Sequence, residues 1–194
     1  MRLYPDVMST LQILNRNGVI LVAYTESMSF YSNYRFRKLE LDQVFDFLYS
    51  PPDHALPHED VANIRKYPVE NYVLKKTVHK FTPEGEKKPN PHILLSILEN
   101  IGVKPDEAVY VGDSLMKDVA MAQHAGVLDV LAAYGAAQHR EQYELLKKVT
   151  HWSRADVERE KAIIAGGEIK PAMTLTQGLR PILAEFDPEA HIAN

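Results

Sequence analysis

Residues 88–133 read KPNPHILLSILENIGVKPDEAVYVGDSLMKDVAMAQHAGVLDVLAA, and this stretch decides the fold. Its first part has the marks of a helix. Pro91 suits the first helical position with Asn90 as the cap, apolar residues then recur at helical spacing as far as Ile101, and Gly102 supplies the stop. The pattern predicts a helix from Pro91 to Ile101.

The second part of the stretch alternates strand and helix. Residues 108–111 form a short apolar run typical of a buried strand, and a helix is expected over 115–125, closed by Gly126. Residues 128–133 form a further apolar strand. Strands that alternate with helices of this length predict a parallel sheet.

The same rhythm extends toward the N-terminus. An amphipathic helix is expected over 6–17, a buried strand over 19–24, a helix over 25–38 and a strand over 44–49. Residues 54–86 are rich in proline, histidine and charge without sustained periodicity, so we expect a long excursion from the core there.

The predicted fold class is therefore α/β, a three-layer α/β/α Rossmann-like parallel sheet. We expect this core to occupy residues 1–135 and a C-terminal helical extension, residues 136–194, to pack on it. Within the extension, helices are expected over 138–148, 153–165 and 175–186.

Composition narrows the class of protein. The 194 residues are 45% hydrophobic and 25% charged, which is typical of a globular domain. A net charge of -4 argues against nucleic acid as a partner, and the absence of cysteine excludes disulfides. The longest apolar run, Val19–Tyr24, is too short to span a bilayer, and no signal peptide is evident at the N-terminus. We expect a soluble, cytoplasmic protein with no membrane association.

Groups suited to phosphate and metal chemistry follow the predicted strands, where ligands gather in α/β sheets. Thr25 comes after the first strand, and Asp113 and Asp118 come after the third. Lys88 precedes a helix N-terminus. Taken singly, Thr25 is an ordinary helix cap, Lys88 a surface lysine and Asp118 a first-turn acid. Their combination at strand and helix ends indicates one site.

These residues resemble the second, third and fourth motifs of the haloacid dehalogenase superfamily. The resemblance rests on Thr25 after a strand, Lys88-Pro-Asn-Pro before a helix, and Val109-Tyr-Val-Gly-Asp113-Ser-Leu-Met-Lys-Asp118. Ala122-Gln-His-Ala-Gly126 follows, and the similarity covers roughly residues 4–135. Gly-Asp with a second aspartate a few positions on is the specific part of the match.

The resemblance implies a Mg²⁺-dependent phosphatase that acts on a small phosphorylated metabolite through an aspartyl-phosphate. Thr25, with Glu26 and Ser27, would bind the phosphoryl oxygens, and Lys88 would neutralise the nucleophile and the phosphate. Asp113 would bind Mg²⁺. Asp118 would bind the ion directly, bind it through water, or orient Lys88.

The family's first motif, Asp-x-Asp at the end of a strand, has no counterpart here. Nothing in residues 1–24 matches it, and no two aspartates in the chain are separated by a single residue. In the family that strand lies between those that carry Thr25 and Asp113. We therefore expect the sheet to lack its first strand, the cap to be absent, and the chain alone to be inactive, unless a missing N-terminal segment or a homo-oligomer completes the sheet.

Other functions stay open. A noncatalytic phosphate-binding or regulatory pseudo-enzyme would keep the same residues without the nucleophile. In a receiver domain the lysine follows both other residues along the chain, whereas Lys88 precedes Asp113, and the Gly112-Asp113 to Asp118 pattern favours phosphate transfer over dehalogenation.

Three further groups of side chains have simpler interpretations. The histidines are more simply surface residues than a second metal site: His54, His58, His79 and His92. A basic cluster is either a charged helix face or a substrate-anion site: Arg35, Arg37 and Lys38. The aromatic residues of the same segment are expected to pack: Phe30, Tyr31 and Tyr34.

Overall fold

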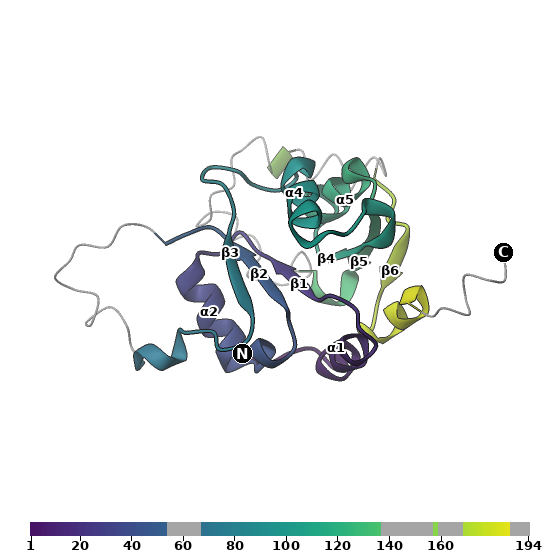
Figure 1. Cartoon of the computed structure of the whole chain (residues 1–194). Coiled ribbons are helices and arrows are strands. Elements are labelled where there is room, and N and C mark those ends of the chain that lie inside the picture. The colour runs from purple at the N-terminus through teal and green to yellow at the C-terminus, as the bar shows by residue number, and fades with distance from the viewer. Residues whose placement is uncertain (54–66, 137–156, 159–168, 187–194) are drawn as a thin grey trace. The chain divides into compact units, whose positions relative to one another are not determined.

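The computed structural model of the chain (Figure 1) describes four stretches of residues: 1–53, 67–136, 157–158 and 169–186. By their internal contacts the residues form two compact units, Met1–Glu86 with Arg180–Asn194, and Lys87–Leu179. Each unit is built on a parallel sheet with helices. The fold is α/β of the Rossmann-like type, as the alternating pattern predicted.

The first unit contains a three-stranded sheet in the order β1-β2-β3. Its strands are β1 (Val22–Tyr24), β2 (Phe47–Ser50) and β3 (Val78–Phe81), all parallel. The central strand β2 is the most buried, and its Leu48 side chain is fully enclosed. A strand buried on both faces explains the continuous apolar run in this part of the sequence.

Within the described residues of this unit, two α-helices are present, α1 (Val7–Arg16) and α2 (Ser29–Lys38). The apolar stripe of α1 buries Leu11 and Leu14, and the 3-10 helix η7 (Arg180–Phe186) packs against α1 although it lies far away in sequence (Figure 1). The short turns of this unit are η1 (Leu41–Gln43) and η2 (Val69–Asn71).

The start of α2 differs from the prediction. The helix begins at Ser29 and not at Thr25, because Asp53 caps it from beyond β2. Its carboxylate accepts hydrogen bonds from Ser29 Oγ at 2.7 Å and from the Phe30 amide at 2.9 Å. A cap supplied by a residue 24 positions away leaves no local signal in the sequence.

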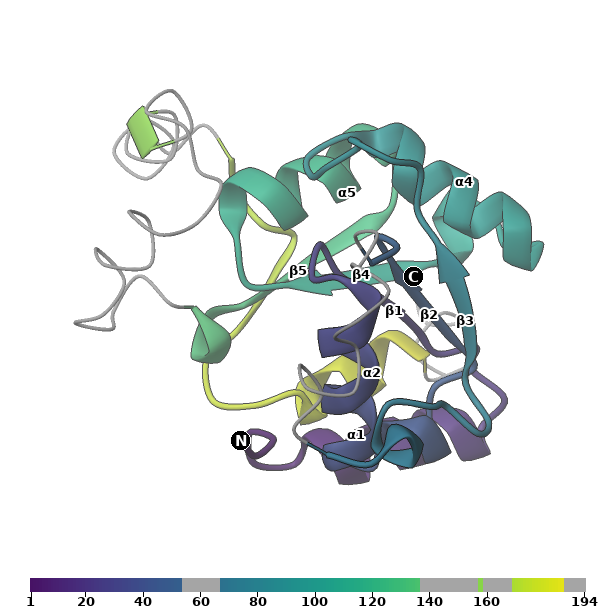
Figure 2. The ribbon, with the colours of Figure 1, turned by 90° about the vertical axis from the view of Figure 1, so that its left-hand side faces the viewer.

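The second unit contains a parallel sheet in the order β4-β5-β6. Its strands are β4 (Val109–Gly112), β5 (Leu128–Ala132) and β6 (Met173–Leu175). The helices α4 (Pro91–Ile101) and α5 (Ala120–Ala125) pack side by side on one face of this sheet (Figures 1 and 2). The shorter helical segments are η3 (Pro105–Glu107), η4 (Leu115–Val119, a π-helix) and η5 (Ala133–Gly135).

Helix α4 confirms the prediction at both ends. The Asn90 side chain accepts the His92 amide at 3.0 Å, and Gly102 ends the helix in the left-handed region at φ 72°. Four residues of the predicted core face are buried, Ile93, Leu94, Ile97 and Leu98, while the fifth, Ile101, is only half-buried.

Several predictions of elements need correction. The excursion 54–86 was expected to lack a core element, yet it contains β3. The helix expected over 175–186 is replaced by β6 and η7. In the described sheets β3 and β6 each pair with one strand only, and that partner lies in another part of the chain. Strands of three or four residues at the edge of a sheet show little of the alternating pattern by which a strand is predicted from sequence.

The helix predicted over 138–148 lies outside the described residues, as does that over 153–165 except for residues 157–158, which are helical. The division into a core to residue 135 and an extension from 136 therefore stays a prediction. Within the described stretches, no helix combines the length and apolar character that a bilayer span requires.

Candidate active site

Gly112, the last residue of β4, makes room for the carboxylate of Asp118. A Cβ atom at Gly112 would overlap Cβ and Cγ of Asp118. Gly112 does not have positive φ, so this close approach is what requires glycine there. The Asp118 side chain is held over the end of β4 by the Ser114 amide, which donates to Oδ2 at 3.1 Å.

The other carboxylate oxygen of Asp118 receives Lys88. The Lys88 Nζ atom lies 2.7 Å from Asp118 Oδ1, and the side chains are only 13% and 7% exposed. The Tyr110 hydroxyl donates to the same oxygen at 3.2 Å, and the ammonium lies 5.5 Å from the centroid of the Tyr110 ring. Tyr110 and Gly112 thus lie on the same face of strand β4, and the Asp118 side chain fills the space that the glycine leaves.

The charge state of Lys88 follows from these contacts. Burial by itself would lower the pKa of the Lys88 ammonium, but Tyr110 and Asp118, through charge and hydrogen bonding, hold that pKa above its usual range. Lys88 is therefore a fixed cation at neutral pH. Removal of one partner from a buried pair leaves an uncompensated charge and typically costs about 3–5 kcal/mol.

Asp113 differs from Asp118 in its surroundings. It follows β4 directly and is exposed, and a Cβ atom at Gly135 of η5 would lie at an ordinary contact distance of 3.6 Å from the Asp113 Cβ atom. The turn after β5 therefore adjoins Asp113 at the carboxyl end of the sheet.

The donor chemistry fits a Mg²⁺ ion held mainly by Asp113. Mg²⁺ prefers carboxylate oxygens and keeps several waters for a substrate phosphate to replace. Asp118 already accepts three hydrogen bonds, so little of its carboxylate is left for direct ligation. In the part of the chain that the structure describes, no three acidic or histidine side chains form a metal-binding cluster.

Thr25 lies in the first unit, directly after β1. Its amide donates to the Tyr49 carbonyl at 3.0 Å, and its hydroxyl oxygen accepts the Ser27 amide at 3.1 Å. Glu26 and Ser27 are half-buried in the same turn, and Arg35 of α2 donates from Nη1 to Ser27 Oγ at 3.0 Å. The turn is ordered by its own side chains.

The structure therefore brings some of the predicted residues together in one unit. Lys88 and Asp118 form an ion pair, and Asp113 belongs to the same unit. Thr25 belongs to the other unit, and its convergence with Lys88 and Asp113 stays a prediction. Sequence reasoning missed Tyr110, although a phenol inside an otherwise apolar strand just before Gly-Asp was a usable signal.

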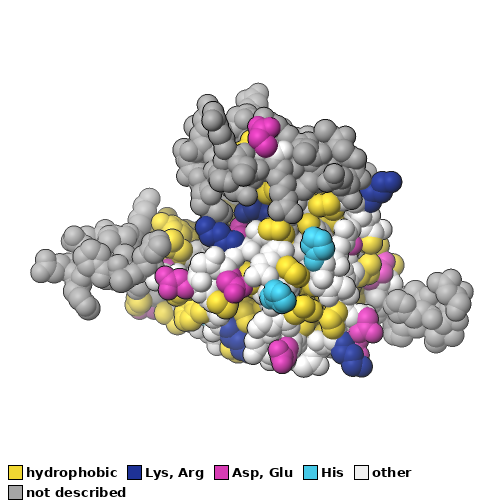
Figure 3. Space-filling view, turned by 90° about the horizontal axis from the view of Figure 1, so that it is seen from above, with side chains coloured by type: hydrophobic (Ala, Val, Ile, Leu, Met, Phe, Trp, Pro, Cys, Tyr) yellow, Lys and Arg dark blue, Asp and Glu magenta, His cyan; other side chains and the backbone are white. Residues whose placement is uncertain are grey.

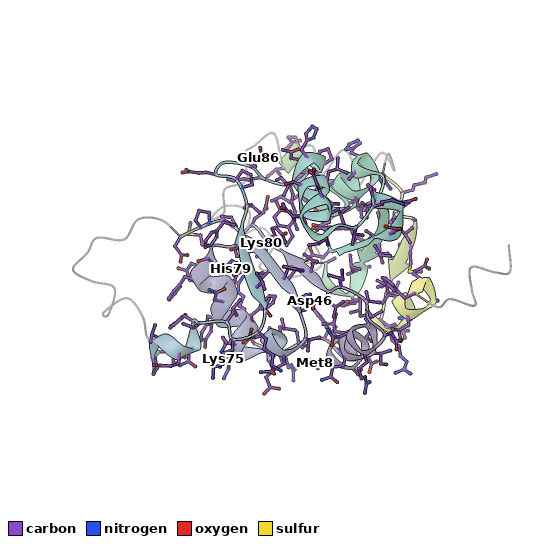
Figure 4. The ribbon with its side chains drawn as sticks, viewed as in Figure 1. Met8, Asp46, Lys75, His79, Lys80 and Glu86 are labelled. Carbon is purple, nitrogen blue, oxygen red and sulfur yellow. The ribbon has the colours of Figure 1, made fainter. Side chains whose placement is uncertain are left out.

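Arg35 and Arg37, two members of the basic cluster on α2, make different contacts. Arg37 donates to Asp42 at 3.0 Å, and the buried Asp42 also accepts backbone amides at the entrance to β3, near Lys75 in Figure 4. Burial alone would raise the pKa of Asp42, but these amides and the guanidinium lower it. Arg37 therefore has a structural role, whereas Arg35 reaches the turn after β1.

The aromatic group is also placed, as are two of the four histidines, while His54 and His58 lie outside the described residues. His92 is exposed as expected, whereas His79 is half-buried. Phe30 stacks on Tyr72 with ring centroids 4.3 Å apart, in agreement with packing. His79 on β3 (Figure 4) lies with Nε2 2.8 Å from Ser50 Oγ, and burial lowers its pKa. On the face in Figure 3 the described charged and histidine side chains are scattered among apolar and neutral ones.

A family model and two curated relatives both relate the chain to phosphatases and other hydrolases. A family model of haloacid dehalogenase-like hydrolases matches residues 1–126. The chain is 47% identical over 57 residues to a glyceraldehyde 3-phosphate phosphatase of Methanopyrus kandleri, which is 29% of this chain and 24% of that protein. It is 26% identical over 132 residues to phosphoglycolate phosphatase 1 of Pseudomonas aeruginosa, which is 68% of this chain and 37% of that protein.

Solved structures show the same fold. A phosphatase of Thermococcus onnurineus superimposes with a TM-score of 0.53 at 21% identity, over 95% of this chain and 57% of that one. A protein of Thermotoga maritima described as a β-phosphoglucomutase gives 0.53 at 17% identity, over 95% and 61%. The chain thus spans only part of the length of the relatives it matches.

Proposed function

Because the chain belongs to the haloacid dehalogenase-like hydrolases, we propose that it forms the phosphate-binding and metal-binding part of a phosphatase that acts on a small phosphorylated metabolite. The observation that carries this proposal is the buried Lys88–Asp118 pair over Gly112, next to the exposed Asp113. A fixed cation beside an exposed carboxylate at the carboxyl end of a parallel sheet suits phosphoryl transfer.

The surroundings of each residue determine its role in the proposed site. Lys88 is held as an ammonium by Asp118 and Tyr110, so it offsets negative charge on the transferring phosphoryl group. Asp113 holds Mg²⁺, which when bound polarises a phosphoryl oxygen. Asp118 orients Lys88, one of the three roles the resemblance left open. Thr25 and the backbone of its turn bind a further phosphoryl oxygen.

The nucleophile is the missing part. In the relatives' chemistry an aspartate attacks phosphorus and forms an aspartyl-phosphate, yet no Asp-x-Asp pattern occurs in these 194 residues. We propose that the attacking aspartate comes from residues outside this sequence, on the same polypeptide or on a partner. The same observation favours a second candidate function, a noncatalytic module that binds phosphate for regulation.

The decisive experiment measures phosphate release from p-nitrophenyl phosphate with Mg²⁺. The 194-residue chain alone should not exceed a buffer blank, because covalent catalysis needs an activated nucleophile. Addition of an upstream Asp-x-Asp strand, fused or as a peptide, should raise the rate by orders of magnitude if the chain is part of an enzyme.

An Asp113→Asn variant of the completed protein serves as the control and should lose that gain. A completed protein that binds phosphate yet stays at the blank would favour the regulatory module. Robust turnover by the unmodified chain would show that another residue is the nucleophile.

A further inference from the structure

The three basic side chains of α2 differ in their interaction partners. Arg37 is neutralised by Asp42, with Nη1 3.0 Å from Oδ2. Lys38 is exposed and has no ion pair among the described residues. Arg35 is also exposed and, in the described part of the chain, has no carboxylate within ion-pair distance, but its Nη1 atom donates to Ser27 Oγ.

Ser27 ties Arg35 to the turn that follows β1. The Ser27 amide donates to Thr25 Oγ1 at 3.1 Å, while its hydroxyl accepts Arg35 at 3.0 Å. Its carbonyl accepts Ser32 Oγ at 2.9 Å, which fastens the turn to α2. One residue thus contacts the Thr25 hydroxyl on one side and the Arg35 guanidinium on the other.

We propose that Arg35 binds a second anionic group of the phosphorylated substrate, a carboxylate, and so selects phosphorylated carboxylic acids over simple phosphate monoesters. The inference rests on the proposed function, in which Thr25 binds the phosphate. A guanidinium presents five N–H donors in a planar fork that matches a carboxylate, and the bond to Ser27 uses one of them.

The size of the effect follows from this geometry. A paired hydrogen bond between two charged groups is stronger than a neutral one, but an exposed arginine loses part of that strength to water. We expect Arg35 to contribute about tenfold in affinity for the carboxylate-bearing ligand.

The test compares two probes by isothermal titration of the full chain with Mg²⁺ at fixed ionic strength. The probes are 2-phosphoglycolate and ethyl phosphate, which share the phosphate monoester and differ in the carboxylate. The matched control is Lys38→Ala, which removes the same charge from the same helix. In Arg35→Lys the charge stays and the planar fork is lost.

Arg35→Ala should weaken 2-phosphoglycolate about tenfold and ethyl phosphate less than about twofold, with Arg35→Lys in between and Lys38→Ala close to wild type. Equal weakening of both probes by Arg35→Ala, full retention in Arg35→Lys, or equal loss in Lys38→Ala would overturn the inference. If the wild type binds both probes with equal affinity, the inference about Arg35 is wrong but the proposed phosphate site stands. Failure of the wild type to bind either probe overturns the proposed phosphate site as well.

Discussion

Replacement of Gly112 by alanine should disrupt the candidate active site from its centre. The new methyl group would occupy the space of Asp118 Cβ and Cγ, so the aspartate must move away from the end of β4. Overpacking costs about 1–3 kcal/mol, and separation of the buried Lys88–Asp118 pair costs about 3–5 kcal/mol. Because the two costs share one displacement, we expect a loss of about 3 kcal/mol or more in the free energy of unfolding.

Urea unfolding followed by circular dichroism measures this loss. The matched control is Gly135→Ala in the same unit, where the added methyl group meets Asp113 Cβ at an ordinary 3.6 Å and should cost less than about 1 kcal/mol. A double-mutant cycle with Asp118→Gly tests the cause, because glycine at position 118 removes both Cβ and Cγ, the two atoms that the new methyl group would overlap. The two losses should combine to less than their sum by about 1–3 kcal/mol. A Gly112→Ala protein as stable as wild type, or strictly additive losses, would refute the reasoning.

Three further predictions follow from the same contacts. Asp113→Ala should weaken Mg²⁺ binding, measured by titration calorimetry, more than Asp118→Ala does, since loss of an indirect ligand costs about 10- to 100-fold; undiminished affinity in Asp113→Ala would contradict this. Tyr110→Phe should cost about 1–2 kcal/mol in urea unfolding and lower the pKa of Lys88, observable by NMR of its ammonium, because a hydrogen bond to a charged group is lost; an unchanged pKa would argue against the positioning role. The folded-state pKa of Asp42 lies below its ordinary value of 3.8, so its contribution to stability is present above about pH 4 and lost as pH falls through the folded pKa; the stability gap between wild type and Asp42→Asn should shrink on acidification, and a gap independent of pH from 7 to 2 would be inconsistent with this.

Local patterns predicted much of the second unit. The Asn90 cap and the Gly102 stop that define α4 lie within or next to the helix, so the sequence there contains the whole signal. The strand before Gly112-Asp113 was equally clear. By contrast, the start of α2 depends on Asp53, and β3 pairs with a strand about 30 residues earlier, so neither could be found from neighbouring residues.

For the candidate site, too, part of the description came from the sequence and part only from the tertiary structure. Residue types and their order along the chain were enough to single out Lys88, Asp113 and Asp118, and to show that no Asp-x-Asp pattern is present. The different surroundings of the two aspartates depend on three-dimensional contacts: Asp118 is buried against Lys88, while Asp113 is exposed. Burial and hydrogen-bond partners come from residues up to 30 positions apart, and these set the strength of each charge. A sequence motif can name the groups at a site, but folding decides which of them is buried in an ion pair and which is exposed.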